Sequence, residues 1–445
     1  MLPKERRDSG QNDLFRARLD QIVDLKHALA RLGRAIDWRF LEERCGAVYT
    51  DAPGHPPLSD EALCERWVEN PYYQLFCGEE FFRHDLPFDR SSMTRWRQRM
   101  GEEKLNALLQ ESLASAVRTG AAKPVDFTSA IVDTTVQPKA VAYPTDARLM
   151  HRSRERLVRL ANTLGIELRQ SYARVGKIAL IKHQRYAHAK QFKRAGKALR
   201  TLKTYLGRVI RDMVRKAKGD AELEAAVAHE LMLARRVHAG NRNLNRVKGL
   251  PKDADLRVFS LHAPEVECIG KGKAHKPYEF GVTVSVATTI NRSKGGQFVT
   301  HIQALPGKPY DGHTLETVIP AIEAQVGATL SRIIADAGYK GHNAPQTHRF
   351  KVYTAGQKRG MTEHIKRQMR RRSAIEPVIG HLKEDHRMGR NHLAGITGDA
   401  VNAVLAAVGY NFRRILAWIR FCVAIIWAAL ALSKRLDPIF EASNC

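Results

Sequence analysis

The first 120 residues place apolar side chains at the three- and four-residue steps of amphipathic helices. Leu63 and Trp67 fall on one face of a helix that Ser59 can cap, because a serine oxygen can accept a hydrogen bond from the free N–H groups of a first turn. A second helix is expected to begin at Ser91 or Ser92 and to continue through a series of leucines. The pattern therefore predicts a helical N-terminal region.

Beyond residue 120 the pattern changes to continuous apolar runs and period-two alternation, which are typical of strands. Elements that alternate between strand and helix predict an α/β fold around a central mixed sheet. The expected elements are strands at 127–133 and 135–146, a hairpin of 276–289 with 298–306, a helix at 313–327, strands at 331–339 and 348–356, and a long basic helix from about residue 361.

Residues 151–250 form a basic helical insertion in this pattern. They contain 25 Lys and Arg against 7 Asp and Glu. Cations recur there at helical spacing, opposite an apolar stripe that runs from Leu199 to Met213. A surface with such an excess of positive charge is self-repulsive unless negative charges bind to it, so the DNA backbone is the expected partner. The alternative is a basic face that contacts only solvent. The cations are Lys190, Lys193, Lys197, Arg200, Arg208, Arg211 and Arg215.

Composition strengthens the case for a polyanionic partner. The chain has 445 residues with 73 Lys and Arg against 46 Asp and Glu, a formal net charge of +27. Its six cysteines form no CxxC pair, which argues against structural zinc and fits the reducing cytoplasm, as does an N-terminus without a secretion-signal core. The twelve-residue apolar run 421–432 is shorter than the roughly 20 residues of a membrane span. We expect a buried C-terminal helix there, with a membrane-associated helix as the alternative.

The two N-terminal helices, the second of them basic, are typical of a helix-turn-helix. In that interpretation Arg95, Arg97 and Arg99 would be available to DNA. The alternative is a helical packing domain with a solvated basic face.

Two apolar strands end directly in an acid. Asp133 follows Ile131-Val132, and Asp336 follows the apolar run 333–335. Functional groups collect at strand ends in α/β sheets, and two aspartates there tolerate each other when a divalent cation lies between them. Each could alternatively cap a turn. Together, in a chain of this charge, they favour a metal site.

A third carboxylate lies in the stretch 372–383. On a helix, Arg372, Glu376, Gly380 and Lys383 share one face, so that Glu376 can hold a metal while the two cations grip phosphates. Pro377 is unfavourable in a helix interior and marks a kink or a restart one turn earlier. A solvated salt-bridge face is the alternative.

These residues lie in longer stretches that resemble bacterial insertion-sequence transposases of the insertion-sequence-five family, within the insertion-sequence-four-like group. The resemblance extends from about residue 60 to 411. The stretches that carry it are FDRSSMTRWRQRMG, IVDTTVQ, YPTDARL, KPYEFG, PYDGHTLE, IIADAGYKGH and RRRSAIEPVIGHLKEDHRMGRNHLAG.

The resemblance implies a ribonuclease H-like catalytic domain in which Asp133, Asp336 and Glu376 hold two Mg²⁺ ions, with Mn²⁺ as a substitute. Arg372 and Lys383 match the spacing of the family's signature around the glutamate, whereas its tyrosine position is occupied by Met369. Other acids that could compete as ligands, ranked below these three, are Asp146, Asp311, Glu384 and Asp385.

The expected organisation is a helical DNA-binding domain (1–120), a catalytic domain (121–410) interrupted by the insertion 151–250, and a helical tail (411–445). The expected function is cleavage of terminal inverted repeats of double-stranded DNA and strand transfer into target DNA by a homo-oligomer in the bacterial cytoplasm, at the nucleoid. Three alternatives remain open: an inactive DNA-binding descendant of a transposase, an endonuclease of the same fold that does not join DNA, and a basic RNA-binding protein, which would leave the two strand-end aspartates unexplained.

Overall fold

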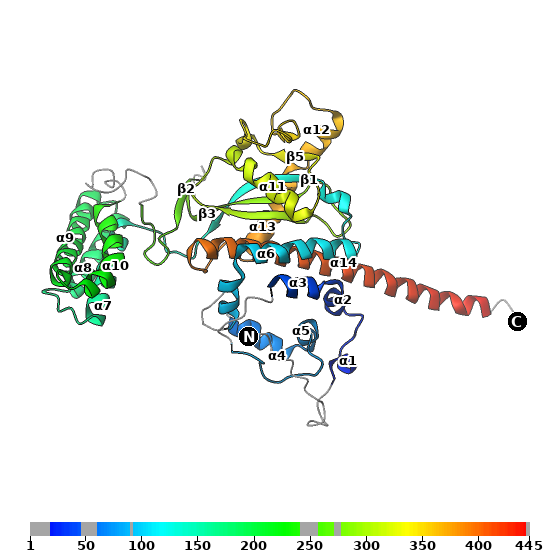
Figure 1. The fold of residues 1–445 in the computed structure, drawn as a ribbon, viewed down its shortest axis with the longest axis horizontal. Helices are drawn as coiled ribbons and strands as arrows, with labels where there is room; N and C mark the ends of the chain where they lie inside the picture. Colours follow the sequence, from blue (N-terminus) through cyan, green and yellow to red (C-terminus); the bar gives the residue numbers. More distant parts are fainter. Residues whose placement is uncertain (1–17, 46–59, 90–91, 241–256, 271–276, 442–445) are drawn as a thin grey trace. The chain divides into compact units, whose positions relative to one another are not determined.

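The computed structural model describes residues 18–45, 60–89, 92–240, 257–270 and 277–441 (Figure 1). The chain divides into two compact units. Residues 1–138 and 282–445 form the first unit, and residues 139–281 form the second. The second unit therefore contains all of the predicted basic insertion together with the segments that flank it.

The described residues form a six-stranded mixed sheet in the order β2-β3-β1-β5-β6, with β4 alongside β3. β1 pairs with β5 and β5 with β6 in parallel, whereas β3 pairs antiparallel with both β2 and β4. The predicted hairpin is confirmed as β3 and β4. The strands are β1 (Ser129–Pro138), β2 (Glu267–Gly270), β3 (Tyr278–Thr289), β4 (Val299–Leu305), β5 (Arg332–Ala335) and β6 (Val352–Thr354).

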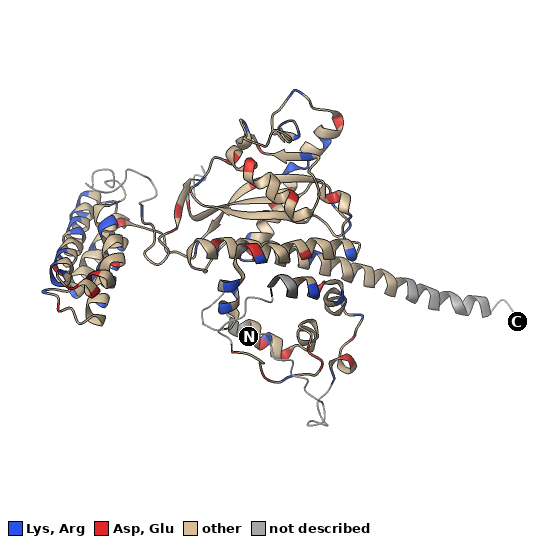
Figure 2. Ribbon diagram, in the orientation of Figure 1, with Lys and Arg blue, Asp and Glu red and all other residues tan. Residues whose placement is uncertain are grey.

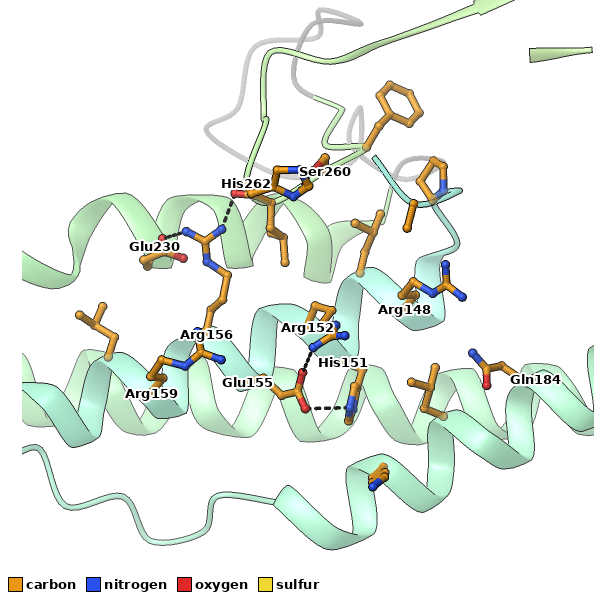
Figure 3. Close-up of a pocket in the computed structure, with 18 of the residues that line it drawn as sticks. Arg148, His151, Arg152, Glu155, Arg156, Arg159, Gln184, Glu230, Ser260 and His262 are labelled. Carbon is orange, nitrogen blue, oxygen red and sulfur yellow. Dashed lines mark hydrogen bonds and ion pairs between the residues drawn. The ribbon is translucent and has the colours of Figure 1, made fainter. Parts of the chain in front are cut away.

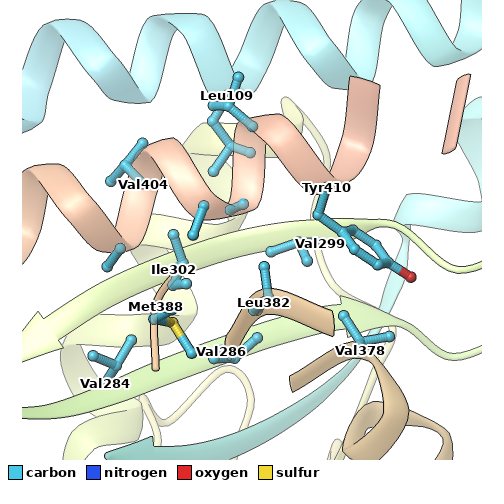
Figure 4. Packing of buried hydrophobic residues seen from close by; sticks show 14 of the residues in the cluster. Leu109, Val284, Val286, Val299, Ile302, Val378, Leu382, Met388, Val404 and Tyr410 are labelled. Carbon is cyan, nitrogen blue, oxygen red and sulfur yellow. The ribbon is translucent and has the colours of Figure 1, made fainter. Parts of the chain in front are cut away.

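Both faces of the central strands are buried, which is why their sequences are continuously apolar. On one face Ala130 and Val132 of β1 pack with α11 (Leu315–Val326). On the other face Ile131 joins a core made by β3, β4, α6 (Ser92–Arg118), α13 (Ile375–Glu384) and the first half of α14 (Gly395–Glu441) (Figure 4). The two predicted strands 127–133 and 135–146 are wrong as separate elements, because no turn residue interrupts β1 before Pro138.

The N-terminal part of the first unit is helical, as predicted for the residues described. α6 starts at Ser92 and is interrupted at Gly101, whose φ of 62° breaks the predicted continuous helix. Ser59 and Ser91, the other two predicted caps, lie outside the described residues. The helices that precede α6 are α1 (Leu19–Ile22), α2 (Ala28–Ala35), α3 (Trp38–Cys45), α4 (Asp60–Glu69) and α5 (Pro71–Phe76).

The expectation of a buried helix at 421–432 is wrong for the side chains that the structure describes there. α14 begins at Gly395, buries Val401 and Val404 in the core, and then continues beyond the residues that pack on it. Among the exposed side chains of its second half are Phe421 (57%) and Trp427 (60%). Among the described residues, no helix is long and apolar enough to cross a membrane.

The second unit contains four helices among its described residues, with a core of their own. Leu202, Leu206 and Met213 of the predicted apolar stripe are buried in that core. Lys and Arg residues are dense along these helices (Figure 2). The helices are α7 (Asp146–Thr163), α8 (Ala173–His188), α9 (Phe192–Ala217) and α10 (Ala221–Ala239).

Candidate active site

Asp133 and Asp336 are brought together by the pairing of β1 with β5. The parallel register places Val132 opposite Ala335. Asp133 is the next residue of β1, and Asp336 directly follows β5. Asp133 Oδ1 accepts a hydrogen bond of 2.8 Å from the N–H of Thr134. Asp336 Oδ1 accepts one of 2.6 Å from the N–H of Ala337, so Asp336 also caps the turn that follows β5.

The surroundings of Asp133 oppose its ionisation. Burial raises the pKa of its carboxyl to about 6, partly opposed by the N–H of Thr134. The negative charges of Asp336 and Asp311 raise this pKa further, whereas the positive charge of Arg372 lowers it. Asp133 therefore lies in a site with an excess of negative charge, which a cation would relieve.

The segment before α13 carries the first cation of the site. Arg372 lies in a 3-10 turn (Arg372–Ala374) and its Nη1 is 3.4 Å from Asp336 Oδ1. α13 starts at Ile375 and packs against β1, with the exposed Glu376 in its first turn. Pro377 also falls in that first turn, where its missing N–H would have had no partner, and this explains why the helix restarts there.

The expected single helix from about residue 361 is therefore wrong. α12 (Glu363–Met369) ends before the 3-10 turn, and α13 follows as a separate helix. Met369, at the tyrosine position of the resemblance, packs against the core beside β3 and β4. Lys383 is half-buried near the end of α13. The cations at 372 and 383 thus come from two elements that adjoin in the chain.

Asp133 thus lies within β1 and not at the end of a strand as predicted, whereas Asp336 directly follows β5. Their carboxylate oxygens suit a hard divalent cation, because such oxygens are the preferred ligands of Mg²⁺. The negative charge around Asp133 supports the same fit. Within the described residues, however, no three His, Cys, Asp or Glu side chains are grouped closely enough to hold a metal. The structure thus pairs Asp133 with Asp336 but does not gather Glu376 into one cluster with them.

Comparison with known proteins places the chain in a family. Residues 17–99 match the family described as Transposase domain (DUF772), and residues 340–416 match the family described as Transposase DDE domain. The chain belongs to the DDE-type transposases. The second match covers Arg372, Glu376 and Lys383, and it starts after Asp336.

The transposase also resembles an uncharacterised protein of Rhizobium meliloti, ORF8 in the nfe locus. The two are 48% identical over 204 residues, which cover 42% of this chain and 98% of that protein, so both belong to one family. No solved structure matches the chain.

Asp311 lies beside Asp133 in the candidate site, although the sequence ranks it below Asp133, Asp336 and Glu376. Thr134 Oγ1 donates a hydrogen bond of 2.8 Å to Asp311 Oδ1, so Asp311 holds the residue that follows Asp133. A Cβ added at Gly338 would lie 3.2 Å from Asp311 Oδ2, so this carboxylate also packs on the turn after Asp336. The stretch PYDGHTLE contains Asp311. Its contact with Thr134 could not be inferred, because the two residues are far apart in the sequence.

The cations predicted to bind DNA differ in exposure. On α6 of the transposase, Arg95 and Arg99 are half-buried, and Arg97 is only 9% exposed because it lies on the packed side of the helix. The second unit exposes Lys190, Lys193 and Lys197 to solvent. Lys190 lies just before α9 and the other two lie in its first turns, and we call the three the α9 cations. The α9 cations are therefore accessible to a partner in solution, whereas Arg97 is buried.

Proposed function

We propose that this transposase binds the terminal inverted repeats of its own insertion sequence, cleaves DNA there and joins the freed 3′ ends to target DNA. The observation that carries the proposal is the side-by-side placement of Asp133 and Asp336 at the parallel strands β1 and β5, with Arg372 on Asp336. The mixed sheet, with β1, β5 and β6 parallel and the β3–β4 hairpin antiparallel, supports a ribonuclease H-like catalytic domain.

Asp133 and Asp336 would hold the metal together with Glu376. When bound, two Mg²⁺ ions, or Mn²⁺ in their place, would acidify the attacking water and neutralise charge at the leaving oxygen. Glu376 is exposed and lies four residues after Arg372, whose side chain contacts Asp336. Glu376 therefore lies in the same segment as the residue that contacts Asp336. Because its side chain is exposed, it can change rotamer without clashing with the core.

Arg372 and Lys383 would orient the DNA. Phosphoryl transfer depends mainly on positioning and on charge neutralisation, which arginine and lysine side chains supply to phosphate oxygens. Arg372 now neutralises Asp336, so the same guanidinium is already held at the aspartates where a phosphate would arrive. In this proposal Arg372 exchanges a carboxylate partner for a phosphate when the metal and the DNA bind.

DNA outside the reacting bond would contact the exposed cations of α9, Lys190, Lys193 and Lys197, and Arg95 and Arg99 of α6. Phosphate contacts of this kind position a duplex without reading its sequence. Two DNA ends must be joined in one reaction, which requires a homo-oligomer. The apolar side chains exposed on α14, Phe421, Ile425, Ile426 and Trp427, support this requirement, because exposed apolar patches commonly mark protein–protein contacts.

The test is a transposition assay in bacteria. A selectable marker bounded by the DNA that flanks this gene is placed on a donor plasmid, and the protein is supplied in trans. We expect wild type to move the marker, with short target duplications, and Asp133→Asn to abolish movement while sparing binding of the flanking DNA. Asp146→Asn, which changes an acid in the first turn of α7, is the matched control and should retain movement.

The outcomes separate the proposal from its two rivals. Binding of flanking DNA by wild type without any cleavage or marker movement would indicate a DNA-binding descendant of a transposase. Cleavage at the ends without joining would indicate an endonuclease. Normal movement with Asp133→Asn would show that the site is assigned to the wrong residues.

A further inference from the structure

A cavity of about 1140 Å³ lies within the second unit (Figure 3). It is bounded by α7, α8 and α10 and by the segment 259–262, and no residue of α9 lines it. Ligand pockets for small molecules measure about 300–1000 Å³. This cavity is larger, so it has room for a segment of a polymer.

One face of α7 gives the cavity its charge. Arg148, Arg152, Arg156 and Arg159 follow one another at steps of four, four and three residues, so all four lie on the same side of the helix, and Lys177 of α8 faces the same space. The carboxylates among the lining residues are Glu155 and Glu230. Cations thus outnumber acids in the wall.

Two of the arginines are already paired and shape the wall. Arg156 donates to Glu230 and to the carbonyl of Leu261, which ties α7 to α10 and to the 259–262 segment (Figure 3). Arg152 Nη1 donates to Glu155 at 3.1 Å. The contacts of Arg156 thus join three walls of the cavity before any ligand arrives, whereas the Arg152–Glu155 pair lies within α7.

The other cations have no acidic partner among the described residues. Arg148 Nη1 donates only to the carbonyl of Tyr143, at 3.4 Å, whereas Arg159 and Lys177 are exposed and make no side-chain hydrogen bond or ion pair there. Apolar side chains, Leu160 and Phe259 among them, complete the wall. An occupant that satisfies this lining needs several negative charges along its length and apolar surface between them.

We propose that this cavity, which we call the α7 cleft, binds the backbone of a DNA strand through residues other than the α9 cations. Arg148 and Arg159 are eleven residues apart, about 16 Å along the helix, and one DNA strand carries a phosphate about every 3.4 Å of duplex axis. The α7 cleft therefore spans several phosphates, and its apolar wall meets the sugars between them. The inference rests on the proposed function, which supplies DNA as the partner.

The experiment measures how DNA affinity depends on salt in the full-length protein. The variant Arg159→Gln/Lys177→Gln removes the two unpaired, exposed cations of the α7 cleft. The matched control, Arg174→Gln/Arg235→Gln, removes two exposed cations of α8 and α10 that do not line it. Each lost phosphate contact flattens the plot of log affinity against log salt by about 0.9. We expect the cleft variant to be flatter by ~1.8 and the control to match wild type.

Three results would overturn the inference. Equal slopes for wild type and the cleft variant would show that DNA does not occupy the cleft, while the proposed function would stand because wild type still binds. Equal losses in variant and control would show a general charge effect. Saturable calorimetric binding of a deoxynucleoside monophosphate, lost in the cleft variant while DNA affinity is unchanged, would assign the cleft to a small phosphate ester. Failure of wild type to bind DNA at all would instead refute the proposed function.

Discussion

The candidate site needs a charged carboxylate at Asp133, but a buried negative charge at this position lowers the stability of the fold. Its folded-state pKa of about 6 lies above the ordinary aspartate value of 3.8 because the carboxyl is largely buried near Asp336 and Asp311. A raised pKa means that the folded state holds the proton more tightly than the unfolded chain does. The resulting stability is present below pH 3.8 and is lost as the pH rises through about 6.

Asp133→Asn should therefore stabilise the metal-free protein at pH 8 by about 2 kcal/mol, allowing for the part of the side chain that stays exposed. The asparagine Oδ1 can still accept the hydrogen bond from Thr134. Urea unfolding of wild type and variant in a chelator, at pH 4 and pH 8, measures the difference. It should shrink towards zero at pH 4, and a difference that is equal at both pH values would contradict this account.

Asp311 offers a test of positioning against metal binding. Asp311→Asn keeps an oxygen that can accept from Thr134, whereas Asp311→Ala leaves that hydroxyl without its acceptor. A positioning role predicts that strand cleavage is mostly retained in Asp311→Asn and falls about tenfold or more in Asp311→Ala, since small displacements of reacting groups are costly. A ligand role predicts that both variants lose Mg²⁺-dependent thermal stabilisation together with cleavage.

At the residue scale, the apolar run before Asp336 was sufficient to place that residue directly after a strand, whereas the run before Asp133 did not show that β1 continues to Pro138. The position of Asp311 could not be predicted in this way. It depends on the packing of two short 3-10 turns, Asp311–Thr314 and Ala337–Tyr339, against each other. The burial of Arg97 could not be predicted either, because the sequence of α6 does not show which of its faces other elements cover.

Among the elements, α14 is joined to the sheet by buried polar side chains as well as by its apolar core, and Asn411 is one of them. Asn411 is fully buried; its Oδ1 accepts from the N–H of Val299 at 3.0 Å, and its Nδ2 donates to the carbonyl of Val299 and to Ser112 Oγ. This amide therefore satisfies the backbone of β4 and joins α14 to α6.

Asn411→Ala should lower the free energy of unfolding by about 3 kcal/mol, because it leaves buried polar groups on β4 unpaired. Ser112→Ala, which removes one of these partners, should cost about 1 kcal/mol. Chemical denaturation followed by circular dichroism gives both values. Equal effects of the two substitutions would mean that the bonds to Val299 contribute nothing to stability.

Strands and helices were predicted best where the local pattern is strong, as in the β3–β4 hairpin and α11. The predicted helix boundaries were wrong where a short local feature interrupts the helix. Gly101 divides α6, and the 3-10 turn from Arg372 separates α12 from α13. The second half of α14 was misjudged because its apolar residues resemble a core helix, although the described residues around them leave them exposed.

For the whole molecule, the net charge of +27 should make DNA binding steeply dependent on salt. Lys190→Gln/Lys193→Gln/Lys197→Gln removes three exposed cations at the start of α9. It should flatten the slope of log affinity against log salt by about 2.7, while cleavage of saturating DNA stays close to wild type. Fluorescence anisotropy over a salt series measures the slope.

A matched variant separates this effect from a general loss of charge. Arg174→Gln/Arg185→Gln/Arg235→Gln removes three exposed cations of α8 and α10 from the same unit. If this variant flattened the slope as much as the α9 variant, DNA binding would depend on the total charge of the unit and not on the α9 face.

The interruption of the sheet by the second unit also bears on the order in which the protein folds. β1 and β3 are hydrogen-bonded neighbours, yet the second unit separates them in the chain. Closing a loop of that length costs about 3 kcal/mol more conformational entropy than closing a tight hairpin. Helices in direct succession, such as α7 to α10, form by local contacts and so fold early, whereas distant strand pairing is slow. A newly synthesised chain would thus carry its basic helices folded before β5 reaches β1. If the proposed function holds, it would bind DNA before it could cleave it.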